Sequence, residues 1–288
     1  MRLARIGAIG AERPAAHIAD DTYVDLSDVV DDFDEVFFAG GGIERIRPLV
    51  AERVERGQTR LRGGERIGSP IARPHQIICV GLNYSDHAAE TGQAVPDEPI
   101  LFTKSPNTLV GPNDDVRIPR GSTKPDWEVE LGIVIGRRAA YLDSREQAAD
   151  HIAGFVTAND VSERTFQLEV SGGQWSKGKC APGFNPTGPW LVTPDEVDPQ
   201  ALRLQSRVNG EPRQDSSTAD MIFPVDHIVW HLSQFLTLEP GDLVLTGTPQ
   251  GVALSGRFPY LAPGDIVDIE IEGLGAQRQE FVAWEAAR

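Results

Sequence analysis

Hydrophobic positions after residue 75 form many short runs separated by turn residues. Residues 77–81 read Ile-Ile-Cys-Val-Gly, a continuous apolar run that predicts a buried strand. Asn209 and Gly210 separate two strand-like segments and predict a two-residue hairpin turn. Apolar residues at helical spacing predict one clear helix, from Pro224 to Leu236. Because predicted strands outnumber predicted helices and no alternating strand–helix–strand order recurs, the pattern predicts a β-dominated α+β fold.

The N-terminal part has a sparser pattern. We expect a small cap domain over residues 1–68 and a larger domain over residues 69–288, which holds all the polar clusters described below. In the cap, a helix is predicted to begin at Pro48, because proline suits a first helical turn, and to end before Gly57. A Gly/Pro-containing segment at residues 68–74 is expected to join the two domains.

Composition limits the classes of partner. The 288 residues carry 43 acidic and 27 basic side chains, a net charge of −16, which disfavours nucleic acid and anionic membranes. No run approaches the ~20 apolar residues of a membrane span, and no secretory pattern is evident. The two cysteines do not suggest a disulfide framework. We therefore expect a cytoplasmic protein that binds a small molecule.

Three carboxylates form the most distinctive pattern. Glu128 and Glu130 alternate along a strand and therefore share a face, and the strand continues into residues 133–135, which are apolar on both faces. With Asp160, these groups would repel one another in a buried place unless a cation joined them. Oxygen-only ligands favour Mg²⁺ or Mn²⁺. The alternative is the solvated face of an ordinary antiparallel strand.

A histidine and a glutamate follow the predicted strand 77–81. His87 and Glu90 lie three residues apart, so on a helical turn the carboxylate can orient the imidazole. Such a pair suits a general base that activates water. An incidental pair on a surface turn remains the alternative.

Further polar groups follow Asp160. If the segment is helical, Asp160, Arg164 and Gln167 share one side, where an arginine and an amide suit a carboxylate or keto oxygen. Lys177 and Lys179 flank a glycine, and a lysine there is suited to stabilising an oxyanion.

A glycine- and threonine-containing loop lies at residues 246–252, and its backbone N–H groups and Thr248 can approach an anion. It lacks the lysine spacing of a nucleotide P-loop. The tryptophans Trp175, Trp190 and Trp230 are expected to lie in the core.

In this order, the clusters resemble the fumarylacetoacetate hydrolase family over roughly residues 70 to 275. The motifs that carry the resemblance are Gly81-Leu82-Asn83-Tyr84 with His87 and Glu90, Glu128-x-Glu130, Asn159-Asp160-Val161-Ser162-x-Arg164, Lys179 and the loop Thr246 to Val252. The resemblance implies the family's mixed β-roll, assembled as a homodimer or a larger homo-oligomer.

The resemblance also implies roles for individual residues. Glu128, Glu130 and Asp160 match the ligands of Mg²⁺ or Mn²⁺, and His87 with Glu90 matches the dyad that polarises water. This dyad lies on a segment that closes over the substrate in relatives.

The remaining matched residues contact the substrate in the family. Lys179 and Gln167 match catalytic residues that hold substrate oxygens, and Arg164 matches a substrate-binding residue. Thr248 lies where a substrate carboxylate is received, and Tyr84 and Lys104 occupy further substrate-binding positions.

The implied activity is that of a hydrolase acting on carbon–carbon bonds in ketonic substances. It would cleave a 2,4-diketo acid, either an acylpyruvate or a 2,4-diketo-3-deoxy sugar acid, to pyruvate and a second acid through a metal-bound enolate. Residues 174–180 and 217–223 are similar to the L-rhamnonate/L-fuconate branch, whereas residues 178–189 depart from the commoner Lys-Ser-Phe-Asp form. The alternatives are oxaloacetate decarboxylation, isomerisation of a 2-hydroxyhepta-2,4-diene-1,7-dioate-type diacid, or a non-catalytic binding protein.

Overall fold

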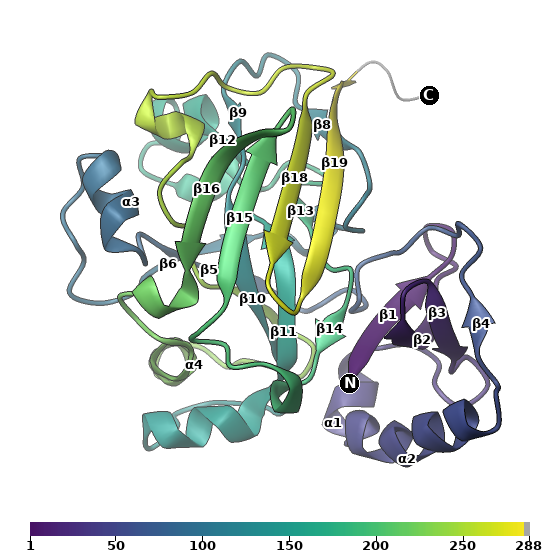
Figure 1. Cartoon of the computed structure of the whole chain (residues 1–288). Helices are drawn as coiled ribbons and strands as arrows, with labels where there is room; N and C mark the ends of the chain where they lie inside the picture. Colours follow the sequence, from purple (N-terminus) through teal and green to yellow (C-terminus); the bar gives the residue numbers. More distant parts are fainter. Residues whose placement is uncertain (285–288) are drawn as a thin grey trace.

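Two β-sheets dominate the computed structural model, which describes residues 1–284 (Figure 1). The larger sheet has ten strands, in the spatial order β4 (Arg60–Leu61), β3 (Thr22–Asp25), β2 (Arg13–Ala19), β1 (Arg2–Ile6), β14 (Leu191–Val192), β11 (Ile152–Asn159), β10 (Val129–Ile135), β17 (Leu243–Leu245), β5 (Ile77–Gly81) and β6 (Ile100–Lys104). The smaller sheet has five, in the order β16 (Glu211–Ser217), β15 (Arg203–Val208), β18 (Ile266–Ile271), β19 (Gly275–Ala283) and β8 (Val116–Ile118).

Two small strand pairs and a few helices complete the fold. The pairs are β12 (Ser162–Glu163) with β9 (Pro125–Asp126), and β13 (Asn185–Pro186) with β7 (Leu109–Val110). The α-helices are α1 (Glu35–Ala39), α2 (Gly42–Glu55), α3 (Ser85–Glu90) and α4 (Val225–Ser233). The predicted β-dominated α+β fold is confirmed. Within residues 1–284, no helix is long and apolar enough to span a membrane.

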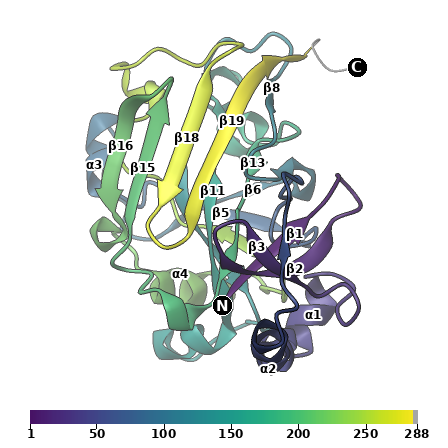
Figure 2. The same ribbon diagram turned by 45° about the vertical axis from the view of Figure 1, so that its right-hand side comes forward.

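The main core lies between the two sheets. Figure 1 shows β15, β16, β18 and β19 lying in front of β10 and β11, and Figure 2 shows the same four strands as one layer in front of β11. Leu131 and Ile133 of β10 belong to the same buried cluster as Leu204 of β15 and Ile269 of β18. Burying both faces of the central strands explains why their sequences read as continuous apolar runs.

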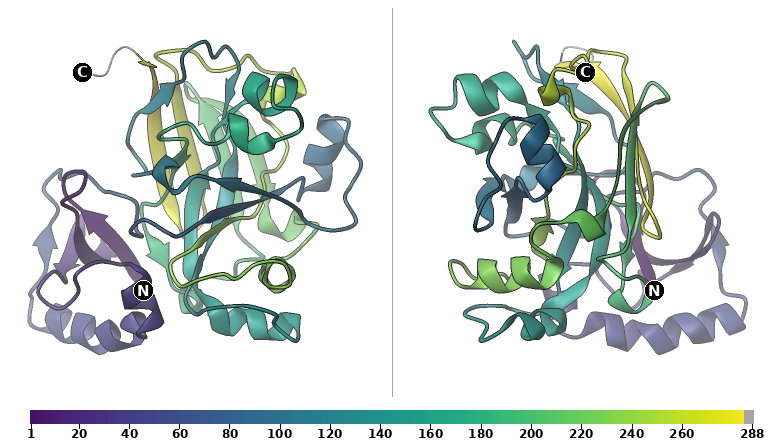
Figure 3. Two further views of the ribbon diagram at one scale, coloured as in Figure 1. Left: turned by 180° about the vertical axis from the view of Figure 1, so that it is seen from behind. Right: turned by 60° about the vertical axis from the view of Figure 1, so that its left-hand side comes forward.

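The N-terminal residues extend the large sheet. Strand β1 pairs with β14 in antiparallel register, with Leu3 opposite Leu191. Figure 3 shows β1–β3, α1 and α2 as a compact unit beside the main body. The division into a cap of residues 1–68 and a domain of residues 69–288 remains a prediction.

Two local predictions have different outcomes. The hairpin is confirmed, since β15 and β16 are joined by Asn209 and Gly210, which both have positive φ values, 53° and 82°. The helix predicted from Pro48 instead begins at Gly42 and contains Pro48 in its interior. An added Cβ on Gly42 would lie 2.3 Å from the Phe37 ring, so the glycine at the first helical position leaves room for that ring.

Candidate active site

Strand directions bring the predicted polar residues to one end of the large sheet. Strand β10 pairs antiparallel with β11, Val129 opposite Asn159, so the start of β10 and the end of β11 meet. Strand β17 is antiparallel to β10 and parallel to β5, so the segments that follow β17 and β5 emerge at the same end. Glu128, Asp160, the loop after β17 and α3 are therefore neighbours despite their separation in sequence.

The three carboxylates form one buried cluster. Glu128, Glu130 and Asp160 are 5%, 2% and 0% exposed, and one oxygen of each lies within 4.8 Å of the others. The alternative of a solvated strand face is therefore wrong, because all three side chains are withdrawn from water.

Lysines neutralise part of this negative charge. The Lys179 ammonium lies 2.6 Å from Glu128 Oε2 and 2.7 Å from Asp160 Oδ2. Lys104 binds Asp160 Oδ1 and donates to the Val161 carbonyl at 3.1 Å. Burial by itself would raise the pKa of Glu128, but Lys179 and Arg164 hold that pKa well below its usual value. Burial also opposes the charge of Lys179, yet Asp160 and Glu128 raise its pKa above the ordinary value.

Glu130 lacks such a close cation. Its Oε2 accepts the Gly247 N–H at 2.8 Å. Burial, followed by the charges of Asp160 and Glu128, raises the pKa of Glu130 well above its usual value. A divalent cation touching all three carboxylates would stabilise Glu130 as an anion. The oxygen-only donors suit Mg²⁺ or Mn²⁺, so these residues fit the expected ion.

Arg164 sits at the start of a five-residue π-helix, Thr165–Glu169, and connects three groups. Its guanidinium donates to Gln167 Oε1 at 2.8 Å, to Glu128 Oε1 at 2.7 Å and to Asp126 Oδ2 at 2.8 Å. The segment from Asp160 to Arg164 is not helical, contrary to our assumption, because β12 intervenes. The convergence of Asp160, Arg164 and Gln167 results from tertiary packing.

Asp126 was missed by the sequence analysis. Its carboxylate also accepts hydrogen bonds from the N–H groups of Ala253 and Leu254, at 2.9 and 3.0 Å. Asp126 therefore links Arg164 to the segment that follows the loop of residues 246–252. The available signal was a lone aspartate directly before the Trp127–Leu131 strand segment.

The histidine–glutamate pair is formed on α3. His87 Nδ1 lies 3.0 Å from Glu90 Oε1. Since an ionised carboxylate only accepts, Nδ1 is the donor of this pair, and in a neutral imidazole Nε2 is then the acceptor. Glu90 also accepts the Gly251 N–H and binds Arg257. Burial opposes the charge of Glu90, but hydrogen bonds from His87 and Arg257 lower its pKa below the usual value.

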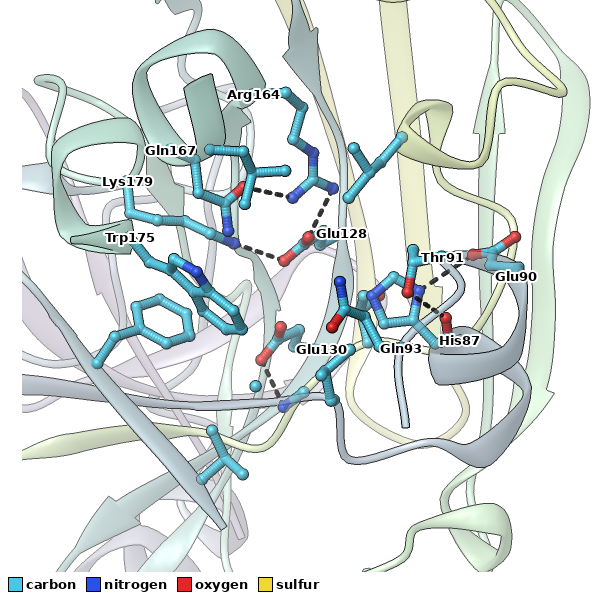
Figure 4. A pocket seen from close by; sticks show the side chains of 18 residues that line it. His87, Glu90, Thr91, Gln93, Glu128, Glu130, Arg164, Gln167, Trp175 and Lys179 are labelled. Atoms are coloured by element: carbon cyan, nitrogen blue, oxygen red, sulfur yellow. Dashed lines mark hydrogen bonds and ion pairs between the residues drawn. The ribbon is translucent and has the colours of Figure 1, made fainter. Parts of the chain in front are cut away.

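A cavity of about 190 Å³ joins these groups (Figure 4). Most predicted site residues line it, namely His87, Glu90, Glu128, Glu130, Arg164, Gln167, Lys179 and Thr248. Asp160 and Lys104 do not line it and lie fully or almost fully buried against one another.

Besides Asp160 and Lys104, two further predicted residues do not line the cavity. Tyr84 is fully buried in the core, and Lys177 donates to the Ser171 carbonyl. Thr248 reaches the cavity, but its hydroxyl donates to the Val129 carbonyl at 2.9 Å and accepts from Gln214 at 2.7 Å. Its single hydroxyl proton is therefore already engaged.

Trp175 does not lie in the core, contrary to the prediction. It is partly exposed and lines the cavity beside Phe102, at 5.7 Å between ring centroids, instead of lying in the core. An added Cβ on Gly81 would lie 2.5 Å from the Trp175 ring, so the glycine makes room for the indole.

These features together define a candidate enzyme site. Around one cavity of a mixed β-roll lie a buried carboxylate cluster, the cations paired with it and a histidine–glutamate dyad. The family model described as fumarylacetoacetate (FAA) hydrolase C-terminal matches residues 76–282. The chain belongs to this family, and the resemblance seen in the sequence is confirmed.

Individual relatives agree with this placement. A 2,4-didehydro-3-deoxy-L-rhamnonate hydrolase of Sphingomonas sp. (strain SKA58) is 43% identical over 290 residues, which cover 99% of this chain and 97% of that protein. The solved 2-hydroxyhepta-2,4-diene-1,7-dioate isomerase of Mycobacterium marinum is 33% identical, with a TM-score of 0.77 over 99% of both chains. Maleylpyruvate hydrolase of Sphingobium sp. SYK-6, solved with manganese(II) and pyruvate, is 26% identical, with a TM-score of 0.80 over 98% of this chain and 99% of that chain.

Proposed function

We propose that this protein hydrolyses the C3–C4 bond of a 2,4-diketo acid, releasing pyruvate and a second acid. The observation that carries the proposal is that His87, whose Nδ1 pairs with Glu90, lines the same cavity as Glu128, Glu130 and their cations. Hydrolysis needs an activated water, and the His87–Glu90 pair supplies a base for it.

The names of the relatives support this class of substrate. One is a hydrolase of a 2,4-didehydro-3-deoxy sugar acid, and another hydrolyses maleylpyruvate. The first is 43% identical to this chain and the second 26%, which favours the sugar-acid branch for this protein.

Glu128, Glu130 and Asp160 would hold the ion, Mg²⁺ or Mn²⁺. When bound there, such an ion would act as a Lewis acid toward the oxygens of the 2-oxo acid. Arg164 and Gln167, which touch one another on the cavity wall, would orient the substrate carboxylate.

The protein residues account for the proton transfers. His87 Nε2 accepts a proton from water, and the resulting hydroxide adds to the C4 carbonyl. The C3–C4 bond then breaks, C4 leaves as the second acid, and the proton held on His87 Nε2 passes to C3 to give pyruvate. Lys179, whose ammonium is held in the cavity wall, stabilises the oxyanion at C4.

Isomerisation or decarboxylation is the second candidate, because the similar solved structure from Mycobacterium marinum is an isomerase. Neither reaction consumes water. The His87→Ala variant therefore separates the candidates, since it should abolish hydrolysis and leave oxaloacetate decarboxylation intact.

The deciding experiment incubates the purified protein with Mg²⁺ or Mn²⁺ and a panel of 2,4-diketo acids and follows pyruvate release. Oxaloacetate serves as the decarboxylation substrate, and His151→Ala, a histidine on an exposed 3₁₀ segment, serves as the matched control. Efficient decarboxylation without hydrolysis of any diketo acid would contradict the proposal.

A further inference from the structure

The two carboxylate oxygens of the dyad glutamate have different partners. Glu90 Oε1 lies 3.0 Å from His87 Nδ1 (Figure 4), whereas Glu90 Oε2 binds the guanidinium of Arg257. The Gly251 N–H reaches both oxygens, at 3.0 Å from Oε1 and 3.1 Å from Oε2. Because donors engage both oxygens, rotation of the carboxylate away from His87 would break contacts on each of them.

Arg257 is carried by a segment that is itself anchored. The buried carboxylate of Asp126 accepts the N–H groups of residues 253 and 254. Gly256 follows the short 3₁₀ turn Ala253–Ser255 with a φ of 76°, a conformation that favours glycine. The Arg257 N–H then donates to Ser255 Oγ at 3.3 Å. The segment therefore presents the guanidinium to Glu90 from a fixed base.

Arg257 lies outside the cavity. Within residues 1–284, the lining of the cavity does not include it, and its side chain is 51% exposed, whereas that of Glu90 is 7% exposed. Any effect of Arg257 on the reaction must therefore pass through Glu90.

Arg257 also offsets a charge that His87 would otherwise offset alone. Burial raises the pKa of Glu90, and hydrogen bonds from His87 and Arg257 lower it below the usual value. A buried anion stabilises a positive charge on the nearest base. Without Arg257, Glu90 would therefore favour the imidazolium form of His87, which cannot accept a proton from water.

The other charged groups that face the dyad do not contact Arg257. Asp86 accepts the backbone N–H of His87, and Glu128 lies across the cavity with its charge offset by Arg164 and Lys179. A substitution at Arg257 leaves these groups in place, so its effect on the dyad can be measured separately.

We propose that Arg257 is a positioning residue for the reaction, because it fixes Glu90 with Oε1 facing His87 Nδ1 and keeps the imidazole in its neutral form. This inference rests on the proposed function, in which His87 takes a proton from water. It adds a residue that the sequence analysis did not single out.

The test measures kcat and KM of Arg257→Gln across the pH range in which activity rises, with a 2,4-diketo acid and saturating Mg²⁺. Loss of the positive charge favours the protonated dyad, so the rise should move to higher pH by about one unit. Below the rise, kcat should be about tenfold lower than in the wild type, and at higher pH the two should converge. KM should change by less than about twofold, because Arg257 does not touch the substrate. Arg257→Lys keeps the charge and should restore most of the wild-type profile.

Arg213→Gln is the matched control. Arg213 and Arg257 both lie against the Phe258 ring, at 4.7 and 5.8 Å from its centroid, but Arg213 donates to the Pro212 carbonyl and not to Glu90. Its pH profile should match that of the wild type. An unshifted profile in Arg257→Gln, an equal fall in kcat at every pH, or the same shift in Arg213→Gln would overturn the inference.

A measurement without turnover separates this inference from the proposed function. Ring ¹⁵N NMR of His87, assigned by comparison with His87→Gln, follows imidazole protonation in the wild type and in Arg257→Gln. The midpoint of that titration should move to higher pH in the variant, and an unchanged midpoint would overturn the inference. If the wild type releases no pyruvate from any 2,4-diketo acid, the proposed function fails, and the NMR midpoint still decides the role of Arg257.

Discussion

Replacing Lys179 by methionine tests the electrostatic account of the site most directly. The ammonium is 1% exposed and touches two buried carboxylates at 2.6 and 2.7 Å, and methionine keeps most of the side-chain volume without the charge. Removing one partner of a buried ion pair typically costs about 3–5 kcal/mol. Because Arg164 still binds Glu128 and Lys104 still binds Asp160, we expect a loss near the lower end, about 3 kcal/mol.

The assay is urea unfolding followed by tryptophan fluorescence, first in chelator and then in Mg²⁺. Lys179 shares the oxygens that would bind the ion, so Mg²⁺ should stabilise the variant more than the wild type. At a free ion concentration of about 100 times the variant's Kd, bound Mg²⁺ stabilises the variant by about 2.7 kcal/mol in total.

Lys177→Met is the matched control, because Lys177 is exposed and bonds only to a backbone carbonyl. It should change stability by no more than about 0.5 kcal/mol. If Lys179→Met unfolds in chelator at the wild-type urea concentration, the ion pairs contribute nothing and our reasoning is refuted. Turnover should fall by about 10²–10³-fold in the Lys179 variant, because an oxyanion donor is lost.

Three further predictions concern other parts of the molecule. Glu130→Gln should be at least as stable as the wild type in chelator but should lose the Mg²⁺-dependent thermal shift; a retained shift would exclude Glu130 as a ligand. Asp195 binds Arg47 of α2 and Thr193, and these hydrogen bonds lower its pKa from 3.8 to about 2. Its stabilisation is therefore present above pH 3.8 and is lost as the pH falls toward 2. The free energy of unfolding of Asp195→Asn should therefore be lower than that of the wild type at neutral pH, and the two values should converge at the lowest pH. A difference that stays constant with pH would contradict this linkage. Gly42→Ala places a methyl group 2.3 Å from Phe37 and should destabilise the protein by about 1–3 kcal/mol in urea unfolding, and a wild-type midpoint would show that the ring moves freely.

Several features could be predicted because their causes are local. Asn209 and Gly210 specify their hairpin through backbone conformations that few other residues adopt. The spacing of His87 and Glu90 within one helical turn brings their side chains together whatever surrounds them.

Other features depend on contacts between distant segments. Trp175 reaches the cavity because Gly81, on a distant strand, leaves space for its ring. Asp126 binds groups on two distant segments, at Arg164 and at residues 253–254, so its neighbours in sequence do not reveal its role.

The sequence by itself determined the family, the β-dominated fold class and the set of polar residues available to the site, because these depend on residue type, order and short-range spacing. The tertiary structure decided which charges offset one another, how deeply they are buried and what forms the outer wall of the cavity. The reason is physical: pKa values and ion-pair strengths depend on distance and desolvation. Both are set by strand pairing, which brings together residues as far apart in sequence as Glu130 and Gly247, whose contact exists only in the folded chain.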